Sequence, residues 1–334
     1  MRARGAGGSY YGAMPTTEEL RVHAALAAAE GWPGVRDGET MRSVALPGMT
    51  LAIRRRAAAL DGLDPALFVH GLGGSSRNWS ALMERLSSDV ECEAVDLPGF
   101  GASPPARTAD YSLYGHARAV IRCLEASERG PVHLFGNSLG GAVATRVAAL
   151  RPDLVRSLTL VSPALPELNP QRTALPTGLL GVPGVTRLLR RVTRDQPPGQ
   201  RARQVLRLCY GDPARITLEE FTAAEAELER RQSLPYFWDS LTRSTRGLVN
   251  AYTLGGQHSL WRQAERVLAP TLLMYGVRDR LVSFRVARRA SRAFGWSRLV
   301  VLPEAGHMAM MEYPEEVATA FRDFLPLTTP AGAG

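Results

Sequence analysis

Ser138 stands in a short motif that suits nucleophilic catalysis. Residues 136–140 read Gly-Asn-Ser-Leu-Gly, directly after the apolar run 132–135 and before the small-residue segment 142–145. A strand, a Gly-Xaa-Ser-Xaa-Gly turn and a helix in this order are typical of a nucleophile elbow, which holds its serine at strained backbone angles. Glycine two positions to either side relieves the crowding. The hydroxyl would then lie at the N-terminus of a helix, where free N–H groups favour developing negative charge.

His307 and Asp279 are the candidates to activate this serine. A serine hydroxyl needs a general base to take its proton, and the base needs an acid that holds it in the productive tautomer. Each candidate follows a short apolar run that predicts a strand, 271–274 before Asp279 and 299–302 before His307. The three residue types in the order Ser, Asp, His, with each one just past a strand end, indicate a catalytic triad.

Two further loops complete the pattern. Residues 67–74, Leu-Phe-Val-His-Gly-Leu-Gly-Gly, predict a strand that runs into a glycine-rich turn, whose flexible backbone can direct an N–H toward an oxyanion. Residues 95–101, Val-Asp-Leu-Pro-Gly-Phe-Gly, predict another strand end and a tight loop. Together with the elbow, these residues resemble the α/β-hydrolase superfamily, specifically its lid-bearing branch of esterases, lipases, haloperoxidase-like enzymes and carbon–carbon bond hydrolases. The resemblance covers about residues 41–162 and 267–327.

The resemblance implies a role for each member of the triad. Ser138 would be the nucleophile, His307 the general base and acid, and Asp279 the carboxylate that orients the histidine. Two other acids are alternatives to Asp279. Asp96 also follows a strand, but its loop is structural in the family, and Glu304 is too close in sequence to His307 to approach the far ring nitrogen easily.

The same resemblance implies an oxyanion hole made of two backbone N–H groups. Leu139, directly after the nucleophile, and Leu72, in the glycine-rich turn, would donate them. Gly73 or Gly74 could replace Leu72 as the inward-facing donor. His70 is expected to support this turn by hydrogen bonding rather than to take part in catalysis.

Strand and helix signals alternate along most of the chain, and this predicts an α/β fold with a mostly parallel sheet of about eight strands covered on both faces. An antiparallel edge pair, 41–46 and 49–56, precedes the parallel series. The remaining strands are expected near 66–70, 91–96, 132–136, 158–162, 271–275 and 298–302, and the core helices near 77–87, 112–128, 139–150, 284–293 and 313–324.

Alternation stops between residues 163 and 266, which read as a helical insertion. The predicted organisation is an N-terminal extension with one helix (1–40), a first core part (41–162), an inserted helical lid (163–266), a second core part (267–327) and a flexible tail (328–334). Helices are expected at 185–193, 201–210, 218–232, 238–250 and 260–267, with Pro-Gly breaks at 183–184 and 197–199. Four aromatic residues of the insertion could line an acyl pocket or form the core of the lid: Phe237, Trp238, Tyr252 and Trp261.

The charge of the chain indicates which classes of binding partner to expect. All 40 basic residues are arginine, and the net charge is +8. The insertion holds 15 arginines and 10 acidic residues, which suits an anionic substrate, peripheral contact with an anionic lipid surface, or simply a solvated helical surface. No motif for nucleic-acid binding accompanies the short arginine runs, so no nucleic-acid partner is expected.

The cysteines and the N-terminal residues favour a cytoplasmic location. Cys92, Cys123 and Cys209 are an odd number in a long chain and lack a metal-ligand spacing, which argues against a disulfide framework and against a metal site. The basic first residues are not followed by a continuous apolar segment, so no secretory signal is predicted. No apolar run approaches the length of a membrane-spanning helix.

The chemistry that follows is acyl transfer on a small-molecule ester or acyl substrate, without a metal or an organic cofactor. A carboxylic or lipid ester is the leading interpretation because the insertion is rich in leucine, valine and aromatic residues. Hydrolysis of a carbon–carbon bond in a vinylogous diketone is the first alternative: Asn137 and the loop 279–282 resemble that group, whereas Met308 stands where it usually has tryptophan. A hydrolase-fold protein that binds and senses a ligand with little turnover is the second.

Overall fold

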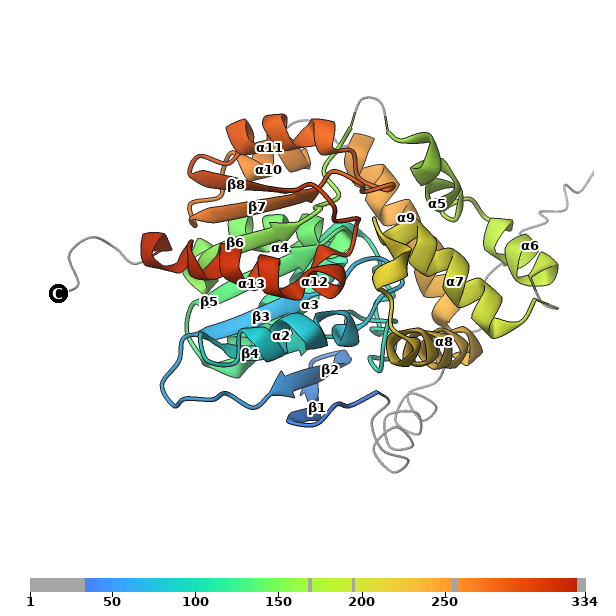
Figure 1. The fold of residues 1–334 in the computed structure, drawn as a ribbon, viewed down its shortest axis with the longest axis horizontal. Coiled ribbons are helices and arrows are strands. Elements are labelled where there is room, and N and C mark those ends of the chain that lie inside the picture. Colours follow the sequence, from blue (N-terminus) through green and yellow to red (C-terminus); the bar gives the residue numbers. More distant parts are fainter. Residues whose placement is uncertain (1–33, 168–169, 194–195, 254–257, 329–334) are drawn as a thin grey trace, which may run out of the picture.

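Eight strands form one sheet in the computed structural model, which describes residues 34–167, 170–193, 196–253 and 258–328 (Figure 1). Their order across the sheet is β1-β2-β4-β3-β5-β6-β7-β8. The β1–β2 and β2–β4 pairs are antiparallel and all other neighbours are parallel, so the predicted mostly parallel sheet is confirmed. The strands are β1 (Glu39–Leu46), β2 (Met49–Arg56), β3 (Pro65–Val69), β4 (Glu91–Val95), β5 (Val132–Asn137), β6 (Val155–Val161), β7 (Thr271–Gly276) and β8 (Ser297–Leu302).

Core helices cover both faces of the sheet, each over its own apolar cluster. One cluster includes side chains of α3, α4, α10 and α11, and the other includes side chains of α2, α12 and α13 (Figure 1). These helices are α2 (Ser80–Arg85), α3 (Leu113–Ser127), α4 (Leu139–Leu150), α10 (Leu260–Ala264), α11 (Ala287–Ala293), α12 (Ala309–Glu312) and α13 (Pro314–Arg322).

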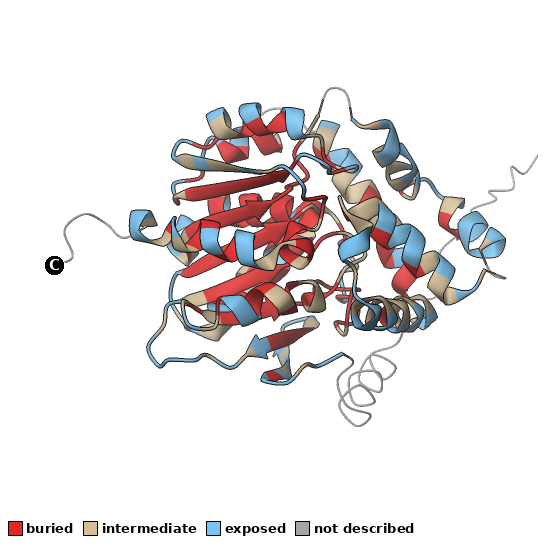
Figure 2. Ribbon diagram, viewed as in Figure 1, coloured by how far each residue is buried: buried red, intermediate tan, exposed pale blue. Residues whose placement is uncertain are grey.

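The burial of each strand follows its place in the sheet. Every residue of β5 and β7 is buried, and both strands are near-continuous apolar runs, as expected for central parallel strands with helices on both faces (Figure 2). At the edges, β1 and β8 alternate more exposed with less exposed residues. The parallel strands β3, β5, β7 and β8 end at the same edge of the sheet, and the loops that carry the predicted site residues follow them.

Helices α5 to α9 make up the insertion between β6 and β7, whereas α10, the last helix of the range 163–266 predicted as lid, packs in the core. They are α5 (Leu175–Leu179), α6 (Val185–Val192), α7 (Pro198–Cys209), α8 (Leu218–Ser233) and α9 (Phe237–Thr253). Thr217 caps the N-terminus of α8: its side chain accepts the Glu220 N–H, and the Glu220 side chain in turn accepts the Thr217 N–H.

The helices in and beside the insertion differ from the predicted bounds in detail. The predicted break at 197–199 lies between α6 and α7, but α7 already begins at Pro198, because proline at the first helical position loses no hydrogen bond. The helix expected over 260–267 already ends at Ala264. The short helix α5, which starts at Leu175 and holds a proline and a glycine, was not predicted. The helix expected near 17–30 and most of the predicted tail lie outside the described residues.

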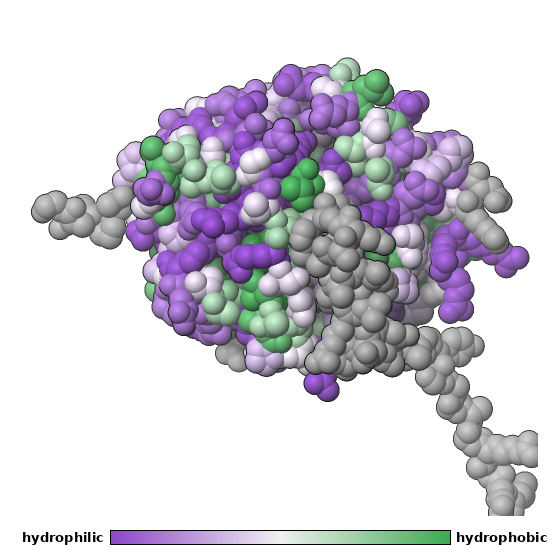
Figure 3. All heavy atoms as spheres, turned by 90° about the horizontal axis from the view of Figure 1, so that it is seen from below, coloured by the Kyte–Doolittle hydropathy of each residue, from purple (hydrophilic) through white to green (hydrophobic). Residues whose placement is uncertain are grey.

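The face of the molecule seen in Figure 3 is mostly hydrophilic, with apolar residues in small patches between charged ones. Scattered apolar side chains of this kind are ordinary on protein surfaces. Within the described ranges, none of the helices has both the length and the apolar character that a membrane span requires.

Candidate active site

Ser138 lies at a sharp turn between β5 and α4. Its backbone angles, φ 54° and ψ −120°, are in a region that a residue with a side chain rarely adopts. A Cβ atom at Gly136 would lie 2.5 Å from the Gly140 carbonyl oxygen, and one at Gly140 would lie 2.2 Å from the Val69 carbonyl oxygen. Only glycine fits at either position, so the turn has the strain and the flanking glycines that the motif predicts.

Asp279 and His307 come together after β7 and β8. The His307 Nδ1 lies 2.9 Å from the Asp279 Oδ2, and both side chains are buried. The other carboxylate oxygen, Oδ1, accepts the N–H groups of Leu281 at 2.8 Å and Val282 at 3.0 Å. Because a carboxylate faces Nδ1, this nitrogen carries the proton of the neutral imidazole, which leaves Nε2 as the acceptor.

Its neighbours hold the Asp279 carboxyl in the charged form. Burial alone would raise its pKa, but the His307 charge and hydrogen bond and the two backbone N–H groups lower the pKa below its ordinary value. Asp279 is therefore a carboxylate at neutral pH.

The two alternative acids have other partners. The Asp96 Oδ1 accepts the Ser76 N–H at 2.5 Å and its Oδ2 accepts the Ala102 N–H at 2.8 Å, so this carboxylate fixes two loops. Glu304 forms an ion pair with Arg278 at the surface. Neither of them contacts His307, and the geometry favours Asp279.

The glycine-rich turn after β3 is closed by a hydrogen bond from the Gly74 N–H to the Gly71 carbonyl oxygen at 3.0 Å. This bond removes Gly74 from the candidate oxyanion donors. Gly73, at φ +68°, takes the position of such a turn that requires a positive φ. Among the described residues, neither the Leu72 N–H nor the Gly73 N–H has an acceptor, so both stay candidates for the oxyanion donor.

His70 supports this turn as expected. Its Nε2 accepts the Leu97 N–H at 3.0 Å, so the proton resides on Nδ1, which donates to the Gly71 carbonyl oxygen at 2.7 Å. Burial lowers the pKa of His70, and the ring stays neutral at physiological pH.

A cavity of about 880 Å³ lies between the insertion and the loops at the sheet edge. Ser138, His307 and the turn 71–75 line it. Its other walls are mostly apolar side chains of the insertion helices, with Leu241, Val249 and Leu206 among them. Its volume is that of a small-molecule binding site.

Three of the four aromatic residues that the sequence offered for the pocket line the cavity. Phe237, Trp238 and Tyr252 line the cavity. Trp261 instead packs in the core, where its Nε1 donates to the Pro166 carbonyl oxygen at 3.2 Å.

Comparison with known proteins places the fold in a family. The sequence pattern of the "Alpha/beta hydrolase family" matches residues 66–320. The chain belongs to the alpha/beta hydrolase family. The chain is 27% identical over 272 residues to a pimeloyl-[acyl-carrier protein] methyl ester esterase of Neisseria meningitidis, which covers 81% of this chain and 96% of that protein. It is 25% identical over 261 residues to the monoacylglycerol lipase abhd6-A of Xenopus laevis, covering 78% and 74% of the two chains.

A solved structure has the same fold as this alpha/beta hydrolase. The meta-cleavage product hydrolase of Pseudomonas fluorescens IP01 superposes with a TM-score of 0.70 at 19% identity, over 86% of this chain and 98% of that one. At this identity the likeness concerns the fold alone.

Glu312 joins the insertion of this hydrolase to the loop that carries His307. Its Oε2 accepts the N–H groups of Gly306 at 2.8 Å and Gly211 at 3.1 Å, and its Oε1 accepts that of Asp212 at 2.7 Å. Beside it, the His307 N–H donates to the Cys209 carbonyl oxygen at 2.7 Å. No local sequence pattern indicates this contact, since two of the three partners lie about 100 residues away.

We expect Glu312→Leu to lower the free energy of unfolding by about 3 kcal/mol, because one buried and two partly buried N–H groups lose their acceptor and an unsatisfied buried group costs about 1–3 kcal/mol. Urea denaturation of both proteins measures the difference. Glu315→Gln is the matched control, because Glu315 is exposed and its ion pairs are at the surface. An equal loss in the two variants would contradict the role of Glu312.

The three cysteines, all within the described residues, are free. Burial raises the pKa of each thiol, that of Cys123 to about 11 and that of Cys209 to about 12. They are therefore protonated and poorly nucleophilic at neutral pH. Among the described residues, no group of histidine, cysteine and acidic side chains could hold a metal ion.

Proposed function

We propose that this protein is a serine hydrolase that cleaves a carboxylic ester through Ser138, His307 and Asp279. One observation supports the assignment above all: the carboxylate-paired His307 and the strained Ser138 line the same cavity. Relatives named as a methyl ester esterase and a monoacylglycerol lipase favour an ester as substrate.

The residues divide the reaction between them. The Nε2 of His307 takes the Ser138 proton as the hydroxyl attacks the ester carbonyl, and Asp279 stabilises the imidazolium that forms. The N–H groups of Leu72 and Leu139 stabilise the tetrahedral oxyanion, the latter as the first N–H of α4, which has no acceptor within its helix. His307 then protonates the departing alcohol, and water hydrolyses the acyl-enzyme by the same steps in reverse order.

The insertion acts as the lid in this proposal. Its apolar side chains form most of the cavity wall away from Ser138, which suits an aliphatic acyl chain of small to medium length. Longer chains should exceed the cavity, so kcat/KM is expected to rise with acyl length and then fall.

Hydrolysis of p-nitrophenyl esters over a series of acyl lengths tests the proposal, beside labelling with a fluorophosphonate probe followed by intact mass. Labelling together with multiple turnover supports it. Labelling without ester turnover would favour a carbon–carbon bond substrate or ligand sensing, whereas absence of labelling would contradict an activated Ser138.

A further inference from the structure

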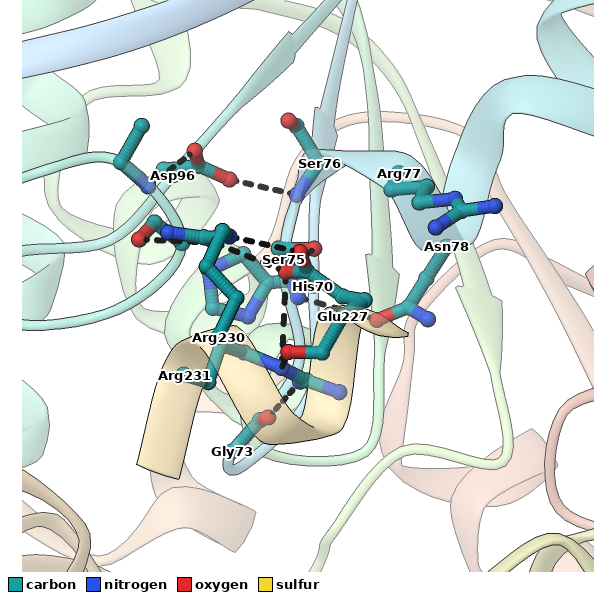
Figure 4. A network of polar contacts seen from close by, with 12 residues as sticks. His70, Gly73, Ser75, Ser76, Arg77, Asn78, Asp96, Glu227, Arg230 and Arg231 are labelled. Carbon is teal, nitrogen blue, oxygen red and sulfur yellow. Dashed lines mark hydrogen bonds and ion pairs between the residues drawn. The ribbon is translucent and has the colours of Figure 1, made fainter. Parts of the chain in front are cut away.

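Helix α8 of the insertion places a buried ionic cluster against the turn 71–75 (Figure 4). Its centre is Glu227, whose side chain is 8% exposed. Arg230 donates from Nε to the Glu227 Oε2 at 2.8 Å, and the Arg231 Nε lies 3.4 Å from the Glu227 Oε1. From the turn, the Ser75 Oγ donates to the same Oε1 at 3.3 Å.

Further hydrogen bonds join arginine side chains to backbone carbonyl groups of the helix and of the turn. Arg77, just beyond the turn, donates to the Ala223 carbonyl oxygen of α8 at 2.7 Å. The Arg231 Nη1 donates to the Gly73 carbonyl oxygen, and Figure 4 shows the guanidinium directed at it. Helix and turn are thus joined in both directions by charged groups that are largely removed from water.

Arg231 acts on the peptide unit between Gly73 and Gly74. The carbonyl oxygen of this unit accepts from Arg231, and its N–H donates to the Gly71 carbonyl oxygen. Both ends of the unit are therefore fixed, although it joins two glycines that otherwise allow it to rotate. If the unit turned, the bond that closes the turn would break, and the Leu72 N–H would lose its direction.

Glu227 keeps this arrangement charged. Burial would raise its pKa, but the Arg230 hydrogen bond and the charges of three arginines lower it below the ordinary value. A carboxylate at this position compensates the buried Arg231 and holds its guanidinium on the turn.

We propose that Arg231 and Glu227 are positioning residues for the oxyanion hole, so that helix α8 of the insertion helps to set the geometry of the transition-state contacts made by Leu72. The proposal rests on the proposed function. A donor that is lost from an oxyanion hole costs about 100- to 1,000-fold in kcat, and a displaced donor should cost somewhat less.

Arg231→Met is the variant that tests it, with Arg246→Met as the matched control. Arg246 is a partly buried arginine of α9 whose Nε likewise donates to a backbone carbonyl oxygen, that of Gly181 at 3.1 Å, and it does not line the cavity. We expect kcat for a p-nitrophenyl ester to fall about 30- to 100-fold in Arg231→Met, with KM changed less than about threefold. Arg246→Met should retain kcat within about threefold.

Two further measurements separate positioning from a loss of folding. The rate of fluorophosphonate labelling should fall in parallel with kcat, because phosphonylation develops charge at the same N–H groups. In Arg231→Ala, added ethylguanidinium should restore a measurable part of kcat, whereas ethylammonium should restore less, since it lacks the planar donor group.

Unchanged kcat in Arg231→Met would overturn the proposal, and so would an equal loss in Arg246→Met or a loss confined to KM. If Arg231→Met does not fold, the same comparison is made with Glu227→Gln, in which we expect a loss of kcat without a change in KM. A wild type that takes the label but hydrolyses no ester would refute the proposed function, while its labelling rate against that of the variants would still decide the role of Arg231.

Discussion

Replacing Ser138 with alanine is expected to lower kcat for ester hydrolysis by about 10⁴- to 10⁶-fold and to abolish fluorophosphonate labelling. Without the hydroxyl no acyl-enzyme forms, and a water molecule would have to attack the ester carbonyl directly. Because alanine removes only an oxygen, the turn should keep its shape, and the thermal midpoint should stay near that of the wild type. Steady-state kinetics, intact mass after labelling and thermal melting provide the test.

Ser127→Ala serves as the control, because this serine caps the end of α3 with a hydrogen bond to the Leu124 carbonyl oxygen and does not line the cavity. It should retain wild-type labelling and turnover. Turnover that survives in Ser138→Ala would mean that another group is the nucleophile, and the triad would have to be reassigned.

Asp279→Asn is expected to lower kcat by about 10⁴-fold while the protein stays folded. The asparagine amide can donate a hydrogen bond to the His307 Nδ1, which moves the proton of the neutral ring to Nε2, and Nε2 then cannot accept the Ser138 proton. The kcat/KM values of the variant and the wild type, measured from pH 5 to 9 with one ester, give the effect.

Glu304→Gln is the comparison that decides between Asp279 and Glu304 as the acid that orients His307. This variant should retain kcat within about twofold. If Glu304→Gln lost activity and Asp279→Asn did not, the acid assignment would be wrong.

The wild type and Asp279→Asn should also differ in how their free energy of unfolding depends on pH. The lowered pKa of Asp279 contributes folding free energy that is present above about pH 4 and is lost as the pH falls through the lower folded value. The stability difference between wild type and Asp279→Asn should therefore narrow below pH 4.

The sheet and the place of the candidate triad residues were predictable because their signals are local. Each central strand is a short apolar run; Ser138 follows β5 directly, and Asp279 and His307 lie in the loops that follow β7 and β8. Parallel strands bring such loops to one edge, so the order of residues along the chain was enough to bring the histidine and its carboxylate together.

The residues that hold the site loops in place have no comparable local pattern in the sequence. Glu227 and Arg231 are charged residues on a helix whose sequence is typical of a solvated surface, and only the position of α8 over the turn 71–75 buries them. Glu312 likewise depends on the backbone N–H groups of Gly211 and Asp212, which are far away in the sequence. Pairings of this length depend on how the insertion docks, which no local pattern of residue types encodes.

The Glu312 contact has a consequence for engineering this hydrolase. Gly211 and Gly306 are in such close contact that a Cβ on Gly306 would lie 2.3 Å from the Gly211 nitrogen, and Glu312 binds the backbone of both segments. The insertion therefore cannot be removed without loss. A chain cut down to its core would expose the Glu312 carboxylate and one side of the loop that carries His307. An exchange of the insertion between relatives would have to transfer residues 209–212 together with their partners around Glu312, or keep both.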